Sequence, residues 1–462
     1  MIAPKPYPAY RDSGLPWLGH VPEHWDVRRN GRLFAQRNDI GHEELPILEV
    51  SLRTGVRVRD LDNGTRKQQM TDRSKYKRAA KGDIAYNMMR MWQGAVGVAP
   101  VDGLISPAYV VARPFPEVEP RYYSYLFRTD GYMREVNMFS RGIVSDRNRL
   151  YWDEFKQMPS AFPPTEEQQR ISDFLDAHGR LTARLIRNKR RLITLLNEQK
   201  QAIINQAVTR GLDPNTPMRP TGIDWMPEIP SHWEIKRLKY LTRFLNGIAF
   251  KPSDWKDSGV PIIRIENLNG GDVFNYTNRS DLPGTLLIQT GDLVFAWSGN
   301  RGTSFGSFEW TRDFPAYLNQ HIFKLEGYDL HRKYFLYLLR AVTKHVEDNA
   351  HGIIGLVHIT KPELGAIFVP LAPEDEQAII ANKIDDDVAE FNQAVEKINS
   401  EIRLIGEYRE RLIADVVTGK LDVRHIEISS SAEELSPDDA EEVEEDLEQD
   451  DVGDVEETDG DE

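Results

Sequence analysis

Two stretches of the sequence, residues 164–213 and 373–422, carry apolar side chains at helical spacing with almost no helix-breaking residue inside them. Each begins at a proline followed by acidic residues and closes just beyond a glycine, which are the start and stop signals of a helix. At 1.5 Å of rise per residue, a helix of about 44 residues is roughly 65 Å long, far beyond the average helix of a globular protein. The pattern therefore predicts two exceptionally long helices.

Apolar residues in the second stretch recur with a heptad period, which is typical of helices that pair in a coiled coil. The first stretch is less regular, because polar residues between Thr182 and Arg191 interrupt the apolar pattern in its middle. We therefore predict that the two helices pair as a coiled coil that is tighter at its ends than at its centre. The residues expected on the pairing face are Leu185, Leu192, Leu196, Ile203, Ile384, Phe391, Ile398, Ile405 and Leu412.

The same order of motifs occurs twice along the chain, at an offset of about 208 residues. Residues 13–29 and 221–237 share a glycine, two tryptophans, a Pro-x-His-Trp group and an arginine in the same order. The offset between matching motifs changes by only one or two residues over the whole length of the repeat, which indicates an internal duplication. Further matches are Pro107-Ala108-Tyr109 with Pro315-Ala316-Tyr317, Glu167-Gln168 with Glu376-Gln377, and Val208-Thr209 with Val417-Thr418.

Short apolar runs bounded by Gly and Asn turns predict β-strands in each half, and two segments with helical spacing accompany them. Each half is therefore expected to be a mixed α and β domain (α/β or α+β) followed by one long helix. The predicted strands are 45–50, 84–86, 109–112, 262–265, 293–297 and 321–325, and the helical segments are 121–139 and 331–346.

Charge is distributed unevenly along the chain. The net charge is −15, but residues 427–462 hold 19 of the 73 acidic residues and no Lys or Arg. The remaining chain has 58 basic and 54 acidic residues and is mildly basic. The acidic segment has too few apolar residues to form a core, so we expect it to be a disordered tail.

Other features of the composition restrict the class of protein. The chain has no cysteine, which excludes disulfides and thiolate metal sites and fits a reducing cytoplasm. No apolar run approaches the roughly 20 residues of a membrane span, so we expect no membrane segment. The N-terminus lacks the basic and apolar regions of a secretory signal. These observations favour a cytoplasmic protein.

The sequence carries no recognisable catalytic motif. The glycine-rich segment 298–306 lacks the Gly-Lys-Ser/Thr of a phosphate-binding loop. His20, Glu23 and His24 have no evident third metal ligand, which favours local packing beside Trp25 over a metal site. There is no serine elbow, helical zinc motif, adenine-methylation tetrad or glycine motif for a methyl-donor nucleotide. We therefore expect a non-catalytic chain without a metal or cofactor of its own.

Basic residues are the most informative polar feature. Residues 53–81 contain ten basic and three acidic residues, which fits binding of DNA phosphates, although a solvated hairpin face is the alternative. Residues 221–372 are charge-balanced but rich in the amide and guanidinium groups that read base edges. The predicted DNA-binding residues are Arg57, Arg59, Lys75, Lys77, Arg90, Arg141, Arg147, Arg264, Asn300, Arg301, Asn319, Gln320 and His351.

Taken as a duplicated and ordered set, these motifs resemble the specificity subunit of type I restriction–modification systems. The resemblance covers residues 13–426 and leaves the acidic tail unexplained. It implies two target recognition domains, at 1–163 and 214–372, that each read one half of a bipartite site in double-stranded DNA. It also implies that the central helix, 164–213, and the distal helix, 373–422, form an antiparallel coiled coil, followed by the acidic tail at 427–462.

The resemblance further implies partners that carry the chemistry. Two methyltransferase subunits would dock on the paired helices and methylate adenine with S-adenosylmethionine. Motor–nuclease subunits would add ATP- and Mg²⁺-dependent restriction, so this chain itself would need no cofactor. Two alternatives remain open at this point: a self-contained enzyme that fuses recognition with methylation or cleavage, and a coiled-coil adaptor that binds only protein.

Overall fold

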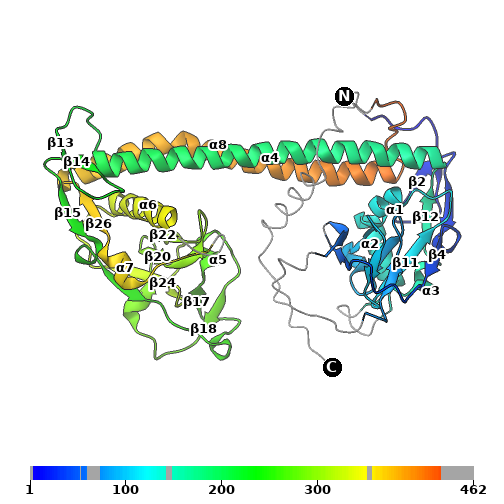
Figure 1. The fold of residues 1–462 in the computed structure, drawn as a ribbon, viewed down its shortest axis with the longest axis horizontal. Helices are drawn as coiled ribbons and strands as arrows, with labels where there is room; N and C mark the ends of the chain where they lie inside the picture. The colour runs from blue at the N-terminus through cyan, green and yellow to red at the C-terminus, as the bar shows by residue number, and fades with distance from the viewer. Residues whose placement is uncertain (1–3, 53, 60–72, 142–147, 351–355, 428–462) are drawn as a thin grey trace. The chain divides into compact units, whose positions relative to one another are not determined.

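The computed structural model describes residues 4–52, 54–59, 73–141, 148–350 and 356–427 (Figure 1). Contacts divide the described chain into two compact units. The first unit comprises residues 4–189 and 400–427, and the second comprises residues 190–399. Each unit therefore contains a globular domain and one part of each long helix. The acidic tail predicted at 427–462 lies, from residue 428 onward, outside the described residues.

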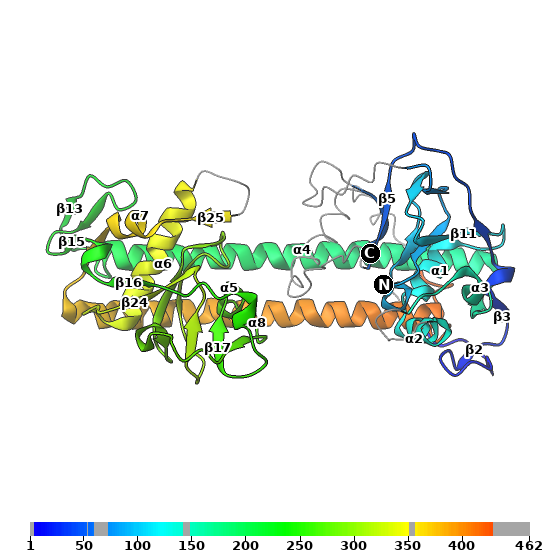
Figure 2. The same cartoon turned by 90° about the horizontal axis from the view of Figure 1, so that it is seen from below.

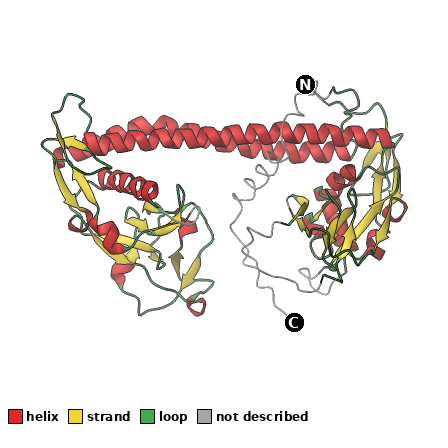
Figure 3. Cartoon of the chain, in the orientation of Figure 1, coloured by secondary structure: helices red, strands yellow, loops and turns green. Residues whose placement is uncertain are grey.

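The two long helices are α4 (Thr165–Arg210) and α8 (Glu374–Val417), and neither is interrupted (Figure 3). Acidic residues fill the first turn of both helices, where negative charge interacts favourably with the helix dipole. Each helix is followed by a glycine with positive φ, Gly211 at +74° and Gly419 at +79°, a conformation that terminates many helices. The prediction of two exceptionally long helices is confirmed.

A four-stranded antiparallel sheet in the order β4-β11-β8-β9 forms the centre of the first unit. Helices α1 (Pro120–Phe127) and α2 (Asp130–Phe139) pack against it through an aromatic core (Figure 2). In that core the Phe34 ring meets Tyr123 edge-on at a centroid distance of 5.3 Å. The strands are β4 (Phe34–Arg37), β8 (Ile84–Asn87), β9 (Val96–Val98) and β11 (Tyr109–Pro114).

The helical segment expected at 121–139 is divided into α1 and α2. Thr129 adopts an extended backbone, with ψ at 145°, and its hydroxyl donates to the carbonyl of Leu126 at 2.7 Å. Such a local bond between a threonine side chain and the backbone competes with continuation of the helix. Helical spacing alone did not predict this break.

The second unit repeats this plan and also has a second four-stranded sheet, where the first unit has the antiparallel pairs β5–β6 and β7–β10 and a parallel bridge between Ile47 and Leu104. Its antiparallel sheet has the order β16-β24-β20-β22, and α6 (Arg332–Asn349) packs on it. This sheet, β18-β17-β23-β19, includes a parallel pair between β17 and β23 and shares a small apolar core with β20 and β24. The strands are β16 (Arg243–Asn246), β17 (Val260–Ile263), β18 (Asn275–Thr277), β19 (Leu287–Ile288), β20 (Leu293–Ala296), β22 (Gly306–Glu309), β23 (Ala316–Leu318) and β24 (Ile322–Glu326).

Smaller elements also correspond between the units. The hairpin β1–β2 of the first unit corresponds to β13–β14 of the second, and the pair β3–β12 corresponds to β15–β26. The remaining bounds are β1 (Tyr10–Asp12), β2 (His20–Pro22), β3 (Asp26–Arg29), β5 (Leu48–Ser51), β6 (Gly55–Val58), β7 (Lys77–Ala79), β10 (Gly103–Ile105), α3 (Trp152–Phe155), β12 (Pro159–Phe162), β13 (Met218–Pro220), β14 (Glu228–Pro230), β15 (Glu234–Arg237), α5 (Ile265–Leu268), β21 (Ser298–Asn300), β25 (Leu356–His358), α7 (Lys361–Ala366) and β26 (Phe368–Leu371).

Candidate nucleic-acid interface

The repeated Pro-x-His-Trp and Glu-Gln motifs contact each other within each unit. In the first unit, buried Glu167 of α4 accepts hydrogen bonds from Trp25 Nε1 at 3.0 Å and from the Tyr7 hydroxyl at 2.6 Å. His24 Nε2 lies 2.8 Å from its other oxygen. Burial, reinforced by the Glu167 carboxylate, raises the pKa of Tyr7 and keeps it a neutral donor. The motifs therefore join the domain to the start of the helix.

The second unit repeats this junction with Glu376 of α8. Trp233 Nε1 donates to its carboxylate at 3.1 Å, and His232 Nε2 lies at 2.6 Å. The neighbouring glutamine also has one role in both units: Gln168 accepts from the Glu119 backbone at 2.9 Å, and Gln377 accepts from the His331 backbone at 2.9 Å. The motifs that reveal the duplication are thus contacts between domain and helix.

A second contact between domain and helix was not predicted from the sequence. Asp176 of α4 accepts from the Tyr125 hydroxyl and from Arg121 Nη1, both at 2.7 Å. In the second unit Asp385 of α8 accepts from the Tyr337 hydroxyl and from Lys333 Nζ. The two aspartates are 209 residues apart, so the offset of the repeat contained the signal that could have found them.

The basic residues predicted to bind DNA in the first unit are only partly available. Arg57 lies in strand β6 and Arg59 directly follows it, and the two flank the carboxylate of Glu49, at 2.7 Å and 3.9 Å. Lys77 donates its ammonium to the carbonyls of Pro107 at 3.1 Å and Tyr109 at 2.8 Å, and burial lowers its pKa. Lys75 is exposed. These contacts give Lys77 a structural role and leave Lys75 open to solvent.

Charged side chains from several segments influence Tyr109. Burial raises its pKa, with a further contribution from Glu49, while Arg90 and Arg59 oppose the shift. Arg59 and Arg90, which are 31 residues apart in sequence, therefore act on the same side chain. Arg141 lies elsewhere in the unit, with its side chain 77% exposed and paired with Glu154 at 2.7 Å. Arg147 is outside the described residues.

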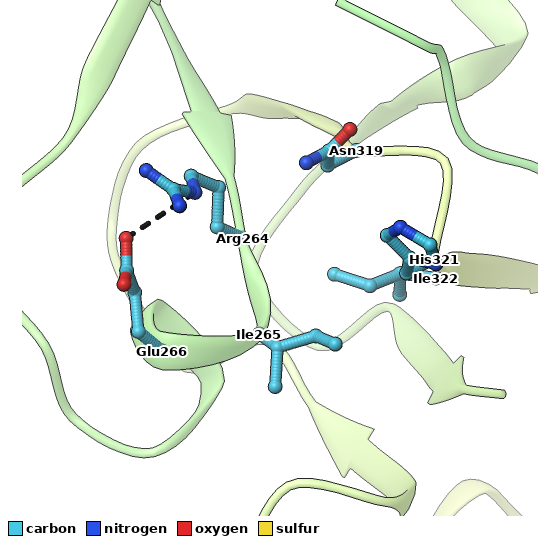
Figure 4. Close-up of a pocket in the computed structure, with 6 residues that line it drawn as sticks. All are labelled: Arg264, Ile265, Glu266, Asn319, His321 and Ile322. Carbon is cyan, nitrogen blue, oxygen red and sulfur yellow. Dashed lines mark ion pairs between the residues drawn. The ribbon is translucent and has the colours of Figure 1, made fainter. Parts of the chain in front are cut away.

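In the second unit, Arg264 and Asn319 line a common pocket of about 160 Å³. Figure 4 shows Arg264 and Glu266 on one side of the pocket and Asn319 and His321 on the other. Arg264 directly follows β17, and Asn319 lies in the turn between β23 and β24. The parallel pairing of β17 with β23 brings these two segments together, although they are 55 residues apart.

The turn between β23 and β24 rests on an aromatic side chain. Trp297 Nε1 donates to the carbonyl of Gln320 at 3.0 Å, and its ring packs against His321 at a centroid distance of 5.1 Å. His358 contacts the other part of the same ring at 5.0 Å. Trp297 thus holds Gln320 and His321 in place beside the pocket. Sequence reasoning did not identify this supporting role.

Asn300 and Arg301 lie in a tight turn at the end of β21. Buried Glu347 of α6 accepts from the Gly302 backbone at 2.7 Å, and the Ser304 hydroxyl accepts from the Asn300 backbone at 2.7 Å. Burial raises the pKa of Glu347. Both predicted side chains are exposed at this braced turn, whereas the predicted residue His351 is outside the described residues.

Comparison with known proteins finds relatives of one kind. The family described as "Type I restriction modification DNA specificity domain" matches residues 230–404. The MjaVIII type I restriction enzyme specificity subunit of Methanocaldococcus jannaschii is 27% identical over 291 residues, which cover 59% of this chain and 64% of that relative. The chain is therefore similar to type I restriction–modification specificity subunits over much of its length.

Another specificity subunit matches over a greater length. The putative MjaX specificity subunit of the same organism is 24% identical over 88% of this chain and 96% of its own length. The alignment with the MjaVIII subunit spans less than two thirds of that relative. A chain from a solved type I R-M system, described for its complex assembly and conformational transition, has a TM-score of 0.57 at 16% identity. It covers 87% of this chain and 99% of its own, and shows that the fold is shared.

The side chains predicted to pair the long helices differ in burial. On α8, Ile384, Ile398 and Leu412 are buried, and Phe391 and Ile405 are partly exposed. On α4, Leu185 and Leu192 are each 45% exposed, and Leu196 and Ile203 are partly exposed. The buried residues nearest to them on α4 are Ile186 and Ile204. Each of these two buried residues directly follows a predicted one, Leu185 or Ile203.

In the described part of the chain, His, Asp and Glu side chains do not gather in threes as metal ligands would, and His24 instead approaches Glu167. Of the helices described, none is both long enough and apolar enough to cross a bilayer.

Proposed function

We propose that this chain reads an asymmetric, two-part sequence in double-stranded DNA, one half with each unit. The observation that carries the proposal is that the units share a scaffold but differ in its polar side chains. Where the inner strand β11 begins, the first unit has Tyr109, whose carbonyl accepts from Lys77; where the corresponding inner strand β24 begins, the second unit has Gln320 and His321 next to Trp297. Two different sets of side chains on one scaffold suit two different base sequences.

We propose that α4 and α8 pair as an antiparallel coiled coil. In the first unit, support comes from Lys189, which lies 2.5 Å from Glu401, and from the contact of His178 with Tyr408. In the second unit, Ile204 and Ile384 belong to one apolar core. The start of α4 thus shares a unit with the end of α8, and the end of α4 shares a unit with the start of α8, as antiparallel helices require.

The proposed partners are two methyltransferase subunits, which would dock on these helices, and motor–nuclease subunits. Leu185, Leu192 and Leu195 leave apolar surface exposed on α4, which is support for docking of another protein. S-adenosylmethionine, ATP and Mg²⁺ would be bound by those partners, and this chain would contribute no catalytic group. The complex would act in the cytoplasm, methylating adenine at the recognised site and restricting DNA that lacks the mark.

Methylation mapping tests this function. A host that lacks adenine methylation at split sites is given the chain together with its methyltransferase partners, and its genome is sequenced for methyladenine. The expected result is one split motif that disappears when this chain is omitted. Methylation by the purified chain alone would instead identify a self-contained enzyme. Assembly with the partners without any base-specific protection of DNA would identify a protein adaptor.

A further inference from the structure

The turn beside the pocket of the second unit holds two buried polar atoms that have no hydrogen-bond partner among the described residues. His321 Nδ1 and Gln320 Oε1 are both buried, and neither has a hydrogen-bond partner in the described chain. Buried polar groups in folded proteins nearly always form hydrogen bonds. Two neighbouring buried atoms that lack a partner therefore point to a ligand or water that supplies the missing hydrogen bonds. Both belong to the turn that lines the pocket with Arg264.

The backbone of this turn is held rigidly. The Asn319 amide donates to the Ile263 carbonyl at 2.9 Å, and the Ile248 amide donates to the Leu318 carbonyl at 2.8 Å. A Cβ on Gly247 would lie 2.1 Å from the Asn319 carbonyl oxygen, so only glycine permits this close approach. With Trp297 packed beneath His321, the polar groups of the pocket are fixed before any ligand arrives.

The hydrogen bonds already made determine what the pocket offers. Asn319 Oδ1 accepts from the Gln320 backbone at 2.8 Å, which leaves the amide nitrogen as a donor on the side of Arg264 (Figure 4). The side-chain nitrogen of Gln320 lies 3.3 Å from His321 Nε2. Because an amide nitrogen only donates, His321 Nε2 is the acceptor, and its proton resides on Nδ1. Arg264, Asn319 and His321 are therefore all donors.

We propose that this pocket takes the major-groove edge of one guanine in the half-site read by the second unit. This inference rests on the proposed function and names the base. Guanine presents two adjacent acceptors, O6 and N7, whereas adenine and thymine each present one acceptor beside a donor or a methyl group. The unpaired Oε1 of Gln320 is an acceptor, which suits the amino group of the cytosine in the same base pair.

Charge supports the same assignment. The Arg264 guanidinium is oriented by Glu266, whose carboxylate lies 3.4 Å from its Nε, and by Asn275 at 3.5 Å. A carboxylate beside the guanidinium weakens attraction for a phosphate but leaves the planar donors free for a neutral base edge. The second unit is charge-balanced, with 16 basic and 16 acidic residues between 221 and 372, so its contribution to binding depends on such donors.

The test uses the full chain assembled with its methyltransferase partners. DNA libraries randomised in both half-sites are methylated by the wild type and by Arg264→Ala, Asn319→Ala and His321→Ala. Each variant is expected to lose discrimination for guanine by about tenfold at one and the same position of one half-site, without change in the other half-site. Arg243→Ala is the matched control, because Arg243 pairs with Glu326 at the opposite end of β24 from His321.

A substituted base provides an atomic readout that does not depend on folding of a variant. 7-Deazaguanine at the identified position lacks N7 but pairs normally with cytosine. This base is expected to reduce methylation by the wild type by about tenfold. Methylation by Arg264→Ala is expected to be nearly the same with 7-deazaguanine as with guanine. Equal weakening on all sequences would show a phosphate contact and overturn the proposal, as would unchanged discrimination. If the wild-type complex recognises no split site at all, the proposed function itself has failed.

Discussion

Trp25 donates its indole hydrogen to the buried carboxylate of Glu167 at 3.0 Å. The second unit repeats the contact between Trp233 and Glu376, at 3.1 Å. In each unit the tryptophan ring also contacts the glycine beyond the other long helix: the Cβ position of Gly419 lies 2.9 Å from Trp25, and that of Gly211 lies 3.4 Å from Trp233. One tryptophan therefore meets the start of one long helix and the end of the other.

This geometry predicts unequal effects of removing the two carboxylates. Glu167→Leu leaves two buried donors unpaired, Trp25 and Tyr7, and each such group costs about 1–3 kcal/mol. Glu376→Leu costs less, because Glu376 has the larger exposed fraction and no tyrosine donates to it in the described chain. Hydrogen exchange of the two units is expected to show the greater loss of protection in the first unit for Glu167→Leu. Equal losses would show that these hydrogen bonds do not stabilise the junction.

Acid should weaken the contact of Asp385 with α6. Burial opposes ionisation of Asp385, but hydrogen bonds from Lys333 and Tyr337 outweigh it and lower its pKa. The folded state then binds fewer protons than the unfolded state near pH 4, so this stabilisation is present at neutral pH and is lost as the pH falls through the lowered pKa. In Asp385→Asn, urea unfolding of the second unit is expected to depend less on pH between 5 and 3 (roughly the range over which carboxylates titrate).

The control for this experiment lies two residues along the same helix. Asp387 forms an i,i+4 ion pair with Lys383 at the surface. Pairs of this kind contribute little to stability, so Asp387→Asn should leave the pH dependence of unfolding close to that of the wild type. A similar loss of pH dependence in both variants would attribute the effect to the charge of the helix and not to the contact with α6.

Salt dependence distinguishes the basic residues of the first unit. Lys75 is exposed, whereas Lys77 donates to two backbone carbonyls in the interior. Replacing Lys75 and Arg59 by Ala should flatten the slope of log K against log salt by roughly one for each phosphate that the variant no longer neutralises. Lys77→Ala should lower thermal stability and leave the slope unchanged. Binding of a labelled split site at several salt concentrations by the assembled complex gives both slopes.

Sequence patterns predicted the long helices and the duplication because these depend on features that recur over many residues. Periodicity placed α4 and α8, but it missed the break at Thr129, where a single hydroxyl competes with the helix. Composition identified a basic segment at 53–81 but could not separate Lys75 from Lys77, since that difference arises from carbonyls at Pro107 and Tyr109.

The pocket in the second unit likewise depends on contacts between distant segments, which residue type alone does not predict. Arg264, Asn319 and Gln320 were predicted from residue type alone, which says nothing about distance. Only the parallel pairing of β17 with β23 brings Arg264 beside Asn319. The support from Trp297 depends in turn on hydrogen bonds between segments more than 20 residues apart.

Removal of the acidic tail should increase binding to random DNA. The 18 acidic residues of 428–462 would compete electrostatically with DNA for the mildly basic remainder of the chain. Truncation after Glu427 is appropriate, because Ile426 is buried in the core of the first unit and its carbonyl accepts from Arg170. The truncated chain is expected to fold, to recognise the same split site, and to bind random DNA more tightly at low salt. A changed recognition motif would contradict this role for the tail.

The last prediction concerns the unread gap between the two half-sites, which the length of the paired helices should determine. The boundary between the units crosses α4 after Lys189 and α8 after Asn399, close to the ion pair of Lys189 with Glu401. Insertion of one heptad at both places keeps apolar side chains in register on each helix. It adds about 10 Å of rise, which is close to three base pairs at roughly 3.4 Å each.

Insertion into both helices should therefore lengthen the gap by about three base pairs and leave both half-site sequences unchanged. Insertion into α4 alone is the control, because it puts the two helices out of register and should reduce methylation without defining a new gap. Methylation mapping of the assembled variants measures motif and gap together. A gap that stays constant in the double insertion, or a half-site that itself changes, would mean that another part of the complex sets the distance. Because each domain contacts the helices through its own Glu-Trp and Asp-Tyr pairs, a longer helix pair should carry the two readers apart without altering either one.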